Sequence, residues 1–488
     1  MKKITSFLLM AAAMIPQPFT LQTTAQTVIT YHHKDIEESK DYVKGNDYQK
    51  DFLLFMDMLQ TTHPAFKQKA PIDVKEELKR GYARCGKCQS QQEFFYTLQQ
   101  LAAKLHDGHT YIQTSSNSDL NYPMHFFMDD EGVYLEAVLK GQEISLGKQI
   151  AKINGKEMSF LYDQFRKFFS TTNEVDYKKT FKNMSNAFYL WKELGLCERD
   201  SSITLSFTDG NTLKLKPIRL QKNSLSRIEN KSQVQQIRQR AGGMPFSYQI
   251  LDGGICYMLF DQCADRNTLR QQYLPQVAGN EKLRERLEQQ LKRIPVFTEF
   301  LDSMFQTMAK QNIKTLVVDV RENPGGNSIL CNELLCRLKS SIIGPRVSIR
   351  PSQLAEEFYQ ANGLDKSLLY STTNVHEQLQ GSATPFLGNV IFIQGERTFS
   401  SAGLLMTMAI DNHIGIAIGE PASYSPTHYG DMLFWNLPNT QTKGYISHKS
   451  YIRPDESKGQ DIPLAKNLST SFQDYQKGID PCFNWVTK

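Results

Sequence analysis

The spacing of apolar residues changes along the chain and divides it into three parts. Between about residues 48 and 113 apolar side chains recur every three or four positions, which predicts a small helical bundle. Between about residues 121 and 220 the pattern predicts short β-strands with a helical insert over about 160–194. From about residue 255 onward apolar runs alternate with helical stretches, which predicts an α/β core with a parallel sheet.

Two runs of this core end in turns that carry chemically useful groups. The run 315–320 closes in the turn Gly325-Gly326, and the run 389–394 leads to Ser400 and Ser401 at the start of a helix-like stretch. Sites in parallel sheets lie at the carboxyl ends of strands. A serine that faces a diglycine turn supplies what acyl transfer needs, namely a nucleophile and backbone N–H donors for the oxyanion.

The chain therefore predicts a multidomain protein that combines α+β and α/β parts. Its 488 residues, 40% of them hydrophobic, suffice to bury a large core in two or three domains. The predicted boundaries are 1–25 for a signal peptide, 26–118 for a helical domain, 119–222 for a β domain with a helical insert, 223–246 for a linker and 247–488 for the core.

The first residues have the pattern of a processing segment. Lys2 and Lys3 precede an apolar stretch, residues 4–15, and small residues then lead to Ala25. A membrane anchor is the alternative, but the stretch is shorter than the roughly 20 residues that a spanning helix requires. We therefore expect an exported protein, periplasmic or extracellular, without a membrane span.

Charge and cysteine content narrow the expected partners. A net charge of +5 from 56 basic and 51 acidic residues is mild, and without a basic run no nucleic-acid partner is expected. Cys85 and Cys88 form a CxxC pair, but nothing completes a metal-ligand set, so no metal site is expected. For an exported protein a local disulfide between them is favoured, and Cys331 and Cys336 are interpreted as buried thiols.

Three segments, taken together, resemble the C-terminal processing, or tail-specific, serine peptidase family. They follow the family's order and are 105–110 (Leu-His-Asp-Gly-His-Thr), 318–326 (Val-Asp-Val-Arg-Glu-Asn-Pro-Gly-Gly), and 398–402 (Thr-Phe-Ser-Ser-Ala) with 418–421 (Ile-Gly-Glu-Pro). The resemblance implies a helical N-terminal part, a PDZ-like domain and a peptidase core of the ClpP/crotonase type. It also implies peptide-bond hydrolysis in polypeptide substrates, no metal or organic cofactor, and Ser400 as the nucleophile.

The PDZ-like part rests on residues 144–155, which resemble the core phrase of such domains. PDZ domains bind extended peptides by adding a strand to a sheet edge. A module that serves only as a spacer or a lid is an equal alternative here.

The register of the motif selects the nucleophile. In the family the nucleophile lies 19 residues before the glycine that ends the next strand; here that glycine is Gly419, and 419 minus 19 is 400. In the branch that uses a serine–lysine dyad the lysine follows 25 residues later, but Ser425 occupies this position. The chain is closer to the other branch, which resembles the tricorn core and the interphotoreceptor retinoid-binding protein repeats and takes a histidine from the N-terminal region. His109 falls on that motif.

The expected roles follow from this resemblance. His109 is the predicted general base for Ser400, because imidazole titrates near neutrality, and His428 is the rival base. Asp455 or Glu456 is the predicted acid that orients the imidazole, and the sequence does not choose between them. Backbone N–H groups of Gly325 or Gly326 and of Ser401 are the predicted oxyanion donors.

Other residues support less reactive interpretations. A serine that begins a helix often serves only as its cap, and Asp319 with Arg321 is interpreted as a structural ion pair or as strand-end polar contacts rather than as chemistry. Gly403 stands where many family members carry Glu. This departure and the missing lysine keep a second function open, in which a degenerate member binds a peptide or small ligand, although the enzyme is favoured.

Overall fold

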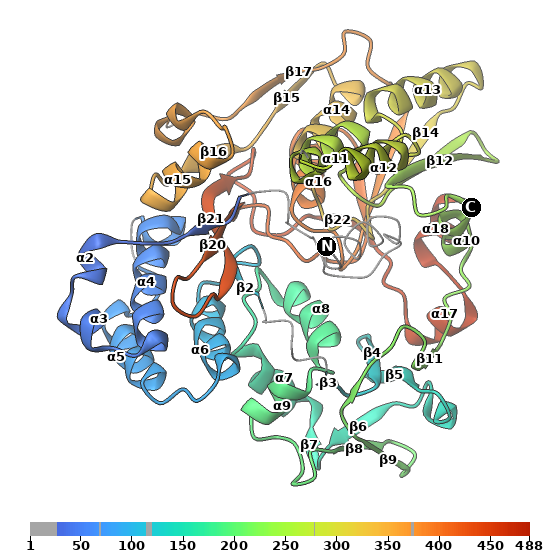
Figure 1. Cartoon of the computed structure of the whole chain (residues 1–488). Coiled ribbons are helices and arrows are strands. Elements are labelled where there is room, and N and C mark those ends of the chain that lie inside the picture. Colours follow the sequence, from blue (N-terminus) through green and yellow to red (C-terminus); the bar gives the residue numbers. More distant parts are fainter. Residues whose placement is uncertain (1–26, 68–69, 114–119, 278, 372–374) are drawn as a thin grey trace.

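The computed structural model describes residues 27–67, 70–113, 120–277, 279–371 and 375–488. The proposed signal peptide lies outside these residues. The described chain forms a mixed α/β structure in which the N-terminal helices, a β region and a central parallel sheet lie around one another (Figure 1). The predicted domain boundaries stay predictions.

The N-terminal helices form the expected bundle. Its main members are α4 (Asp47–Thr62), α5 (Val74–Cys85) and α6 (Gln91–Ala103), which follow β1 (Ile29–Thr30), α2 (Lys34–Glu37) and α3 (Lys40–Lys44). Asn46 begins α4 with a capping box that includes Gln49, and Asp73 and Ser90 cap α5 and α6. The helical periodicity thus predicted this region correctly.

The bundle packs on strands from the far end of the sequence. Phe55 of α4 meets Trp435 of β20, with 5.4 Å between ring centroids, and Figure 1 shows the blue helices beside the orange-red strands β20 and β21. These strands belong to a sheet in the order β1-β20-β21-β16, with β2 paired to β21. Their bounds are β2 (Tyr111–Ile112), β16 (Arg346–Ile349), β20 (His428–Asn436) and β21 (Lys443–Ile452). The apolar pattern does not predict this sheet, which joins N-terminal residues to strands from the C-terminal part of the sequence.

The β region holds three small sheets and the predicted helical insert. Two sheets have the orders β11-β5-β4 and β7-β6-β8-β9, and the third pairs β10 (Ile218–Arg219) with β3 (Leu120–Asn121). The strands are β4 (Met124–Met128), β5 (Val133–Leu139), β6 (Ile150–Ile153), β7 (Lys156–Glu157), β8 (Ile203–Phe207), β9 (Thr212–Leu215) and β11 (Leu225–Arg227). The insert consists of α7 (Met158–Arg166), α8 (Glu174–Met184) and α9 (Phe188–Glu193).

The central sheet has the order β12-β13-β14-β18-β19-β22, and every neighbouring pair except β12–β13 is parallel. Its strands are β12 (Phe246–Leu251), β13 (Ile255–Phe260), β14 (Thr315–Asp319), β18 (Asn389–Gln394), β19 (Ile416–Gly419) and β22 (Leu464–Asn467). The apolar runs form buried strands, as predicted, because both faces of a parallel sheet are covered. Among the covering helices are α13 (Phe297–Lys310), α14 (Ser328–Leu338) and α16 (Ser401–Asp411).

The remaining elements connect or extend these layers. They are η1 (Pro64–Phe66), η2 (Glu143–Ser145), α10 (Gln233–Arg240), α11 (Arg266–Tyr273), η3 (Leu274–Val277), α12 (Glu281–Leu291), β15 (Ser341–Ile343), α15 (Gln353–Ala361), η4 (Lys366–Tyr370), β17 (Gln378–Gln380), α17 (Phe472–Lys477) and α18 (Pro481–Val486). Within the described ranges, no helix combines the length and the apolarity needed to cross a bilayer.

Two smaller predictions have different outcomes. Arg321 and Asp319 form the predicted structural ion pair at 2.8 Å, and Arg321 also binds Asp480 at the start of α18 at 2.9 Å. The disulfide prediction is wrong for this structure, because Cys85 and Cys88 are free thiols like the other cysteines.

Candidate active site

Ser400 lies on a strained turn between β18 and α16. Its backbone has φ 52° and ψ −125°, a region that residues other than glycine rarely adopt. The turn is fixed from the neighbouring strand end, because Phe399 donates its N–H to Asn323 O at 3.1 Å and Thr398 Oγ1 donates to Val320 O at 2.8 Å. The Ser400 side chain makes no capping bond to α16. The Ser400 hydroxyl therefore does not serve as a helix cap, which is the less reactive role that the sequence allows.

His109, from a distant part of the sequence, lies within hydrogen-bonding distance of Ser400. Its Nε2 lies 3.1 Å from Ser400 Oγ, and its ring stacks on Phe399 at 4.6 Å between centroids. The loop that carries His109 joins α6 to β2, and β2 pairs with β21 through Tyr111 and Tyr445. This pairing holds the histidine loop against the core, so a remote part of the sequence reaches the nucleophile.

The rival base His428 also lies near this site. Its ring stacks with His109 at 6.0 Å between centroids and with Tyr451 at 5.1 Å. Burial, and secondly the neighbouring His109, lower the pKa of His428 to about 4. A ring with this pKa is a weak base at neutral pH, and the hydrogen-bonding distance to Ser400 belongs to His109.

Asp107 is the carboxylate beside His109. Its Oδ1 accepts the His109 backbone N–H at 3.0 Å and lies 3.7 Å from the ring Nδ1, an ion-pair distance rather than a hydrogen bond. Its Oδ2 accepts from His63 Nε2 at 3.0 Å, Thr110 Oγ1 at 2.6 Å and Ser447 Oγ at 2.7 Å. Burial raises the pKa of Asp107, but His109 and His63 outweigh it and hold this pKa well below the ordinary value. Asp107 is therefore an anion.

The predicted acids Asp455 and Glu456 are wrong. Asp455 accepts from Ser457 Oγ at 2.6 Å and pairs with Lys458, whereas Glu456 binds Arg346 at 2.8 Å. Both sit in a loop held by other ion pairs. Asp107, which stands two residues before His109 in the quoted motif, has the contacts that were expected of them.

The diglycine turn lies against the nucleophile, as predicted. A Cβ built on Gly325 would lie 2.7 Å from Ser400 Cβ and 2.9 Å from Ser401 N, so only glycine fits there, and its φ of 103° needs glycine as well. The Gly325 N–H, however, already donates to Asn323 Oδ1 at 2.8 Å. The N–H groups of Gly326 and Ser401 make no hydrogen bond within the described chain. Of the predicted donors, these two are available.

The insert contacts the site through α8 and the residues just before it, an arrangement that the sequence does not predict. Thr172 Oγ1 accepts the Gly108 N–H at 3.2 Å, and Asn173 Nδ2 donates to Tyr424 O at 2.9 Å. Lys179 of α8 lies 4.9 Å from the centroid of the Phe399 ring. The insert thus touches both the histidine loop and the serine turn.

The departure at Gly403 has a steric reason. A Cβ on this glycine would lie 2.3 Å from the ring of Tyr424, which fills the space beside α16. Tyr424 immediately precedes Ser425, the position where the serine–lysine branch carries its lysine. Both departures therefore occur at one spot, where an aromatic ring packs on the nucleophile helix.

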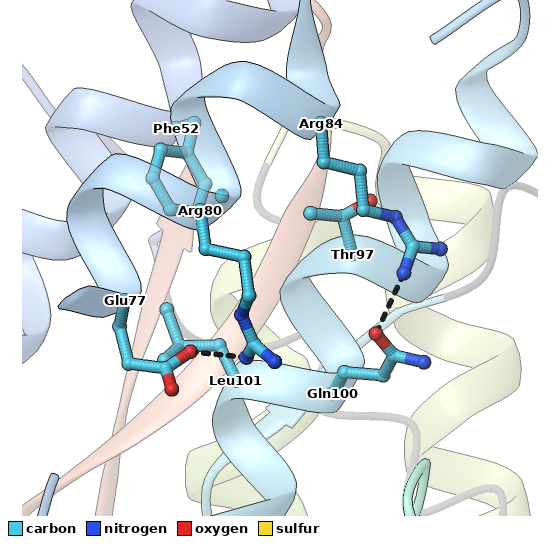
Figure 2. Close-up of a pocket in the computed structure, with 8 residues that line it drawn as sticks. Phe52, Glu77, Arg80, Arg84, Thr97, Gln100 and Leu101 are labelled. Carbon is cyan, nitrogen blue, oxygen red and sulfur yellow. Dashed lines mark hydrogen bonds and ion pairs between the residues drawn. The ribbon is translucent and has the colours of Figure 1, made fainter. Parts of the chain in front are cut away.

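A cavity of about 150 Å³ lies in the N-terminal bundle, and Figure 2 shows its cations already paired, Arg80 with Glu77 and Arg84 with Gln100. Among the residues that the structure describes, no group of three or more histidine, cysteine or acidic side chains could hold a metal ion.

The chain is similar to known proteins in part of its sequence and in its fold. Residues 291–460 match the model of peptidase family S41, whereas no curated protein matches the chain by sequence. Among solved structures, mature CPAF complexed with lactacystin has a TM-score of 0.61 at 12% identity, covering 91% of this chain and 97% of that one. Mature CPAF alone has a TM-score of 0.59 at 12% identity, covering 88% and 94%. At this identity the likeness concerns the fold alone, but it extends over nearly the whole chain. Residues 291–460 are therefore similar to peptidase family S41, and the described fold is similar to that of mature CPAF.

Proposed function

We propose that this chain is an exported serine endopeptidase that hydrolyses peptide bonds through an acyl-enzyme on Ser400. The observation that carries the proposal is the 3.1 Å distance between Ser400 Oγ and His109 Nε2, with the Asp107 carboxylate behind the same ring. A nucleophile, a base in hydrogen-bonding reach and an acid beside the base are the parts that acyl transfer requires.

The first half-reaction uses each group in turn. The Ser400 oxygen attacks the substrate carbonyl carbon while His109 Nε2 takes the hydroxyl proton. The Asp107 carboxylate stabilises the imidazolium that forms, and it favours the tautomer with the proton on Nδ1, which leaves Nε2 free to accept. His109 then gives the proton to the departing amine, and the acyl group stays on Ser400.

Backbone donors stabilise the charge that develops during attack. The N–H groups of Gly326 and Ser401, which have no acceptor among the described residues, are suited to the tetrahedral oxyanion, and losing one such donor costs roughly 100-fold to 1000-fold in rate. Water then attacks the acyl-enzyme with His109 again as base, which releases the second product and restores Ser400.

The remaining parts of the proposal rest on sequence. The PDZ-like assignment, the ClpP/crotonase-type core and export through residues 1–25 come from the motifs and the N-terminal pattern. Polypeptides are the expected substrates because residues 291–460 match the model of a peptidase family. No metal or organic cofactor takes part in the proposed steps.

A fluorophosphonate probe tests this function against the degenerate binding protein. The enzyme predicts covalent labelling of the wild type and none of Ser400→Ala. Ser425→Ala, a buried serine outside the proposed chemistry, is the control and should label normally. Absence of labelling across near-neutral pH would favour the binding protein.

A further inference from the structure

His63 ends helix α4 and lies 44 residues before Asp107 in the chain. It is fully buried, and its Nδ1 accepts the Ala65 N–H at 3.2 Å, so it caps the short helix η1. A ring nitrogen that accepts a hydrogen bond carries no proton, so the proton of the neutral ring is on Nε2. This Nε2–H donates to Asp107 Oδ2 at 3.0 Å.

The surroundings of His63 fix its ring. Arg350 donates from Nη1 to the His63 carbonyl at 2.9 Å, which anchors the end of α4. The ring makes edge contacts with Phe66 and Tyr429, at 6.5 and 5.0 Å between centroids. These contacts fix the orientation of the ring, so its Nε2–H points at the Asp107 carboxylate.

The two oxygens of the Asp107 carboxylate have different partners. His63 comes from the bundle, Thr110 from the histidine loop and Ser447 from β21, and all of them bind Oδ2. Oδ1 is left for His109, through its backbone N–H and its ring. Because Oδ2 is held by its donors, Asp107 cannot rotate without breaking several bonds.

We infer that His63 is a positioning residue for hydrolysis: it holds Asp107 so that Oδ1 faces the His109 ring. The inference rests on the proposed function and deepens it. His63 transfers no proton, since its Nδ1 is occupied by the Ala65 N–H and its Nε2–H by Asp107. A histidine that served only to cap η1 would need its Nδ1 but not its Nε2–H.

Two substitutions separate these roles. His63→Asn places an amide oxygen near the Nδ1 position, so the cap on Ala65 can persist while the donor to Asp107 is lost. His63→Gln reaches further, so its amide N–H can replace Nε2–H. Thr62→Val is the matched control, because Thr62 is equally buried on the same helix and its hydroxyl donates to Ser352, at 3.0 Å, instead of to Asp107.

The experiment measures fluorophosphonate labelling with the maximal rate constant and the probe affinity resolved. We expect His63→Asn to lower the maximal rate constant about 10-fold to 100-fold, the size of one lost hydrogen bond to a charged group, with the affinity unchanged. His63→Gln should recover most of this loss, and Thr62→Val should label like the wild type.

Each outcome bears on the inference separately from the proposed function. A folded His63→Asn that labels at the wild-type rate overturns it, as does a loss that appears only in the affinity. Equal losses in His63→Asn and His63→Gln, with equal melting temperatures, also overturn it. A wild type that does not label overturns the proposed function itself.

Discussion

Replacing Asp107 by Asn should disable His109 while leaving the shape of the site in place. The Asp107 Oδ2 side accepts from His63, Thr110 and Ser447, so the amide oxygen of the variant must take that side. The NH₂ group then points at the His109 ring, where Oδ1 now lies 3.7 Å from Nδ1.

An amide in this orientation donates to His109 Nδ1. The ring proton then moves to Nε2, which can no longer accept from Ser400. The same change in serine proteases with an Asp–His–Ser triad lowers the catalytic rate constant by about 10⁴. Because the ring contact here is longer, we expect a loss of about 10³-fold to 10⁴-fold in the acylation rate.

The loss of the charge also affects stability. The amide group faces the His109 backbone N–H, which loses its acceptor, and one unsatisfied buried group costs about 1–3 kcal/mol. Urea unfolding should therefore show a lower free energy of unfolding, and single-turnover acylation with a chromogenic ester should show the much larger kinetic effect.

The control is another buried aspartate in the same bundle. Asp51 accepts the Thr440 N–H at 2.6 Å and also binds Asn439. Neither partner belongs to the proposed active site. Asp51→Asn should lose stability but keep the acylation rate. An Asp107→Asn variant that acylates within 10-fold of the wild type would refute the role given to this carboxylate.

Three further substitutions follow from the same geometry. Gly325→Ala forces a methyl group to within 2.7 Å of Ser400 Cβ at a φ of 103°. Thermal melting should show that the free energy of unfolding falls by at least about 2 kcal/mol. Normal fluorophosphonate labelling of this variant would contradict the tight turn. Ser400→Gly removes the strain of a non-glycine residue at φ 52°; the free energy of unfolding should rise by about 1 kcal/mol while hydrolysis stops, and a lower stability would contradict the strain. Burial and His109 lower the pKa of His428 to about 4, so the unfolded state takes up the proton first and the free energy of unfolding falls as the pH drops from 6.5 to 4. His428→Asn should reduce this fall by up to about 3 kcal/mol in urea titrations. An unchanged fall would argue against the lowered pKa.

The sequence predicted those features that depend on local composition. The runs 315–320 and 389–394 are apolar at most positions that pack, so strands are the natural prediction, and each run contributes a buried strand to the central sheet. The helical periodicity of the bundle likewise predicted α4, α5 and α6. The distance from Ser400 to Gly419 selected Ser400, and in the structure the hydroxyl within reach of His109 Nε2 is that of Ser400.

Features that depend on long-range contacts were missed. The sequence motif does not predict Asp107 as the acid, because nothing in the turn reveals that its side chain folds back beside His109. His63 and Ser447 lie 44 and 340 residues from Asp107, so their convergence appears only when β2 pairs with β21. Asp455 and Glu456 were chosen by their place in the core, and ion pairs with Lys458 and Arg346 hold them elsewhere.

The most direct measurement of the central claim is cleavage of an unstructured polypeptide, followed by mass spectrometry, with wild type, Ser400→Ala and His109→Ala prepared in parallel. The account predicts new peptide termini with the wild type and rates at least about 10³-fold lower with each variant. Equal cleavage by the wild type and Ser400→Ala would contradict it.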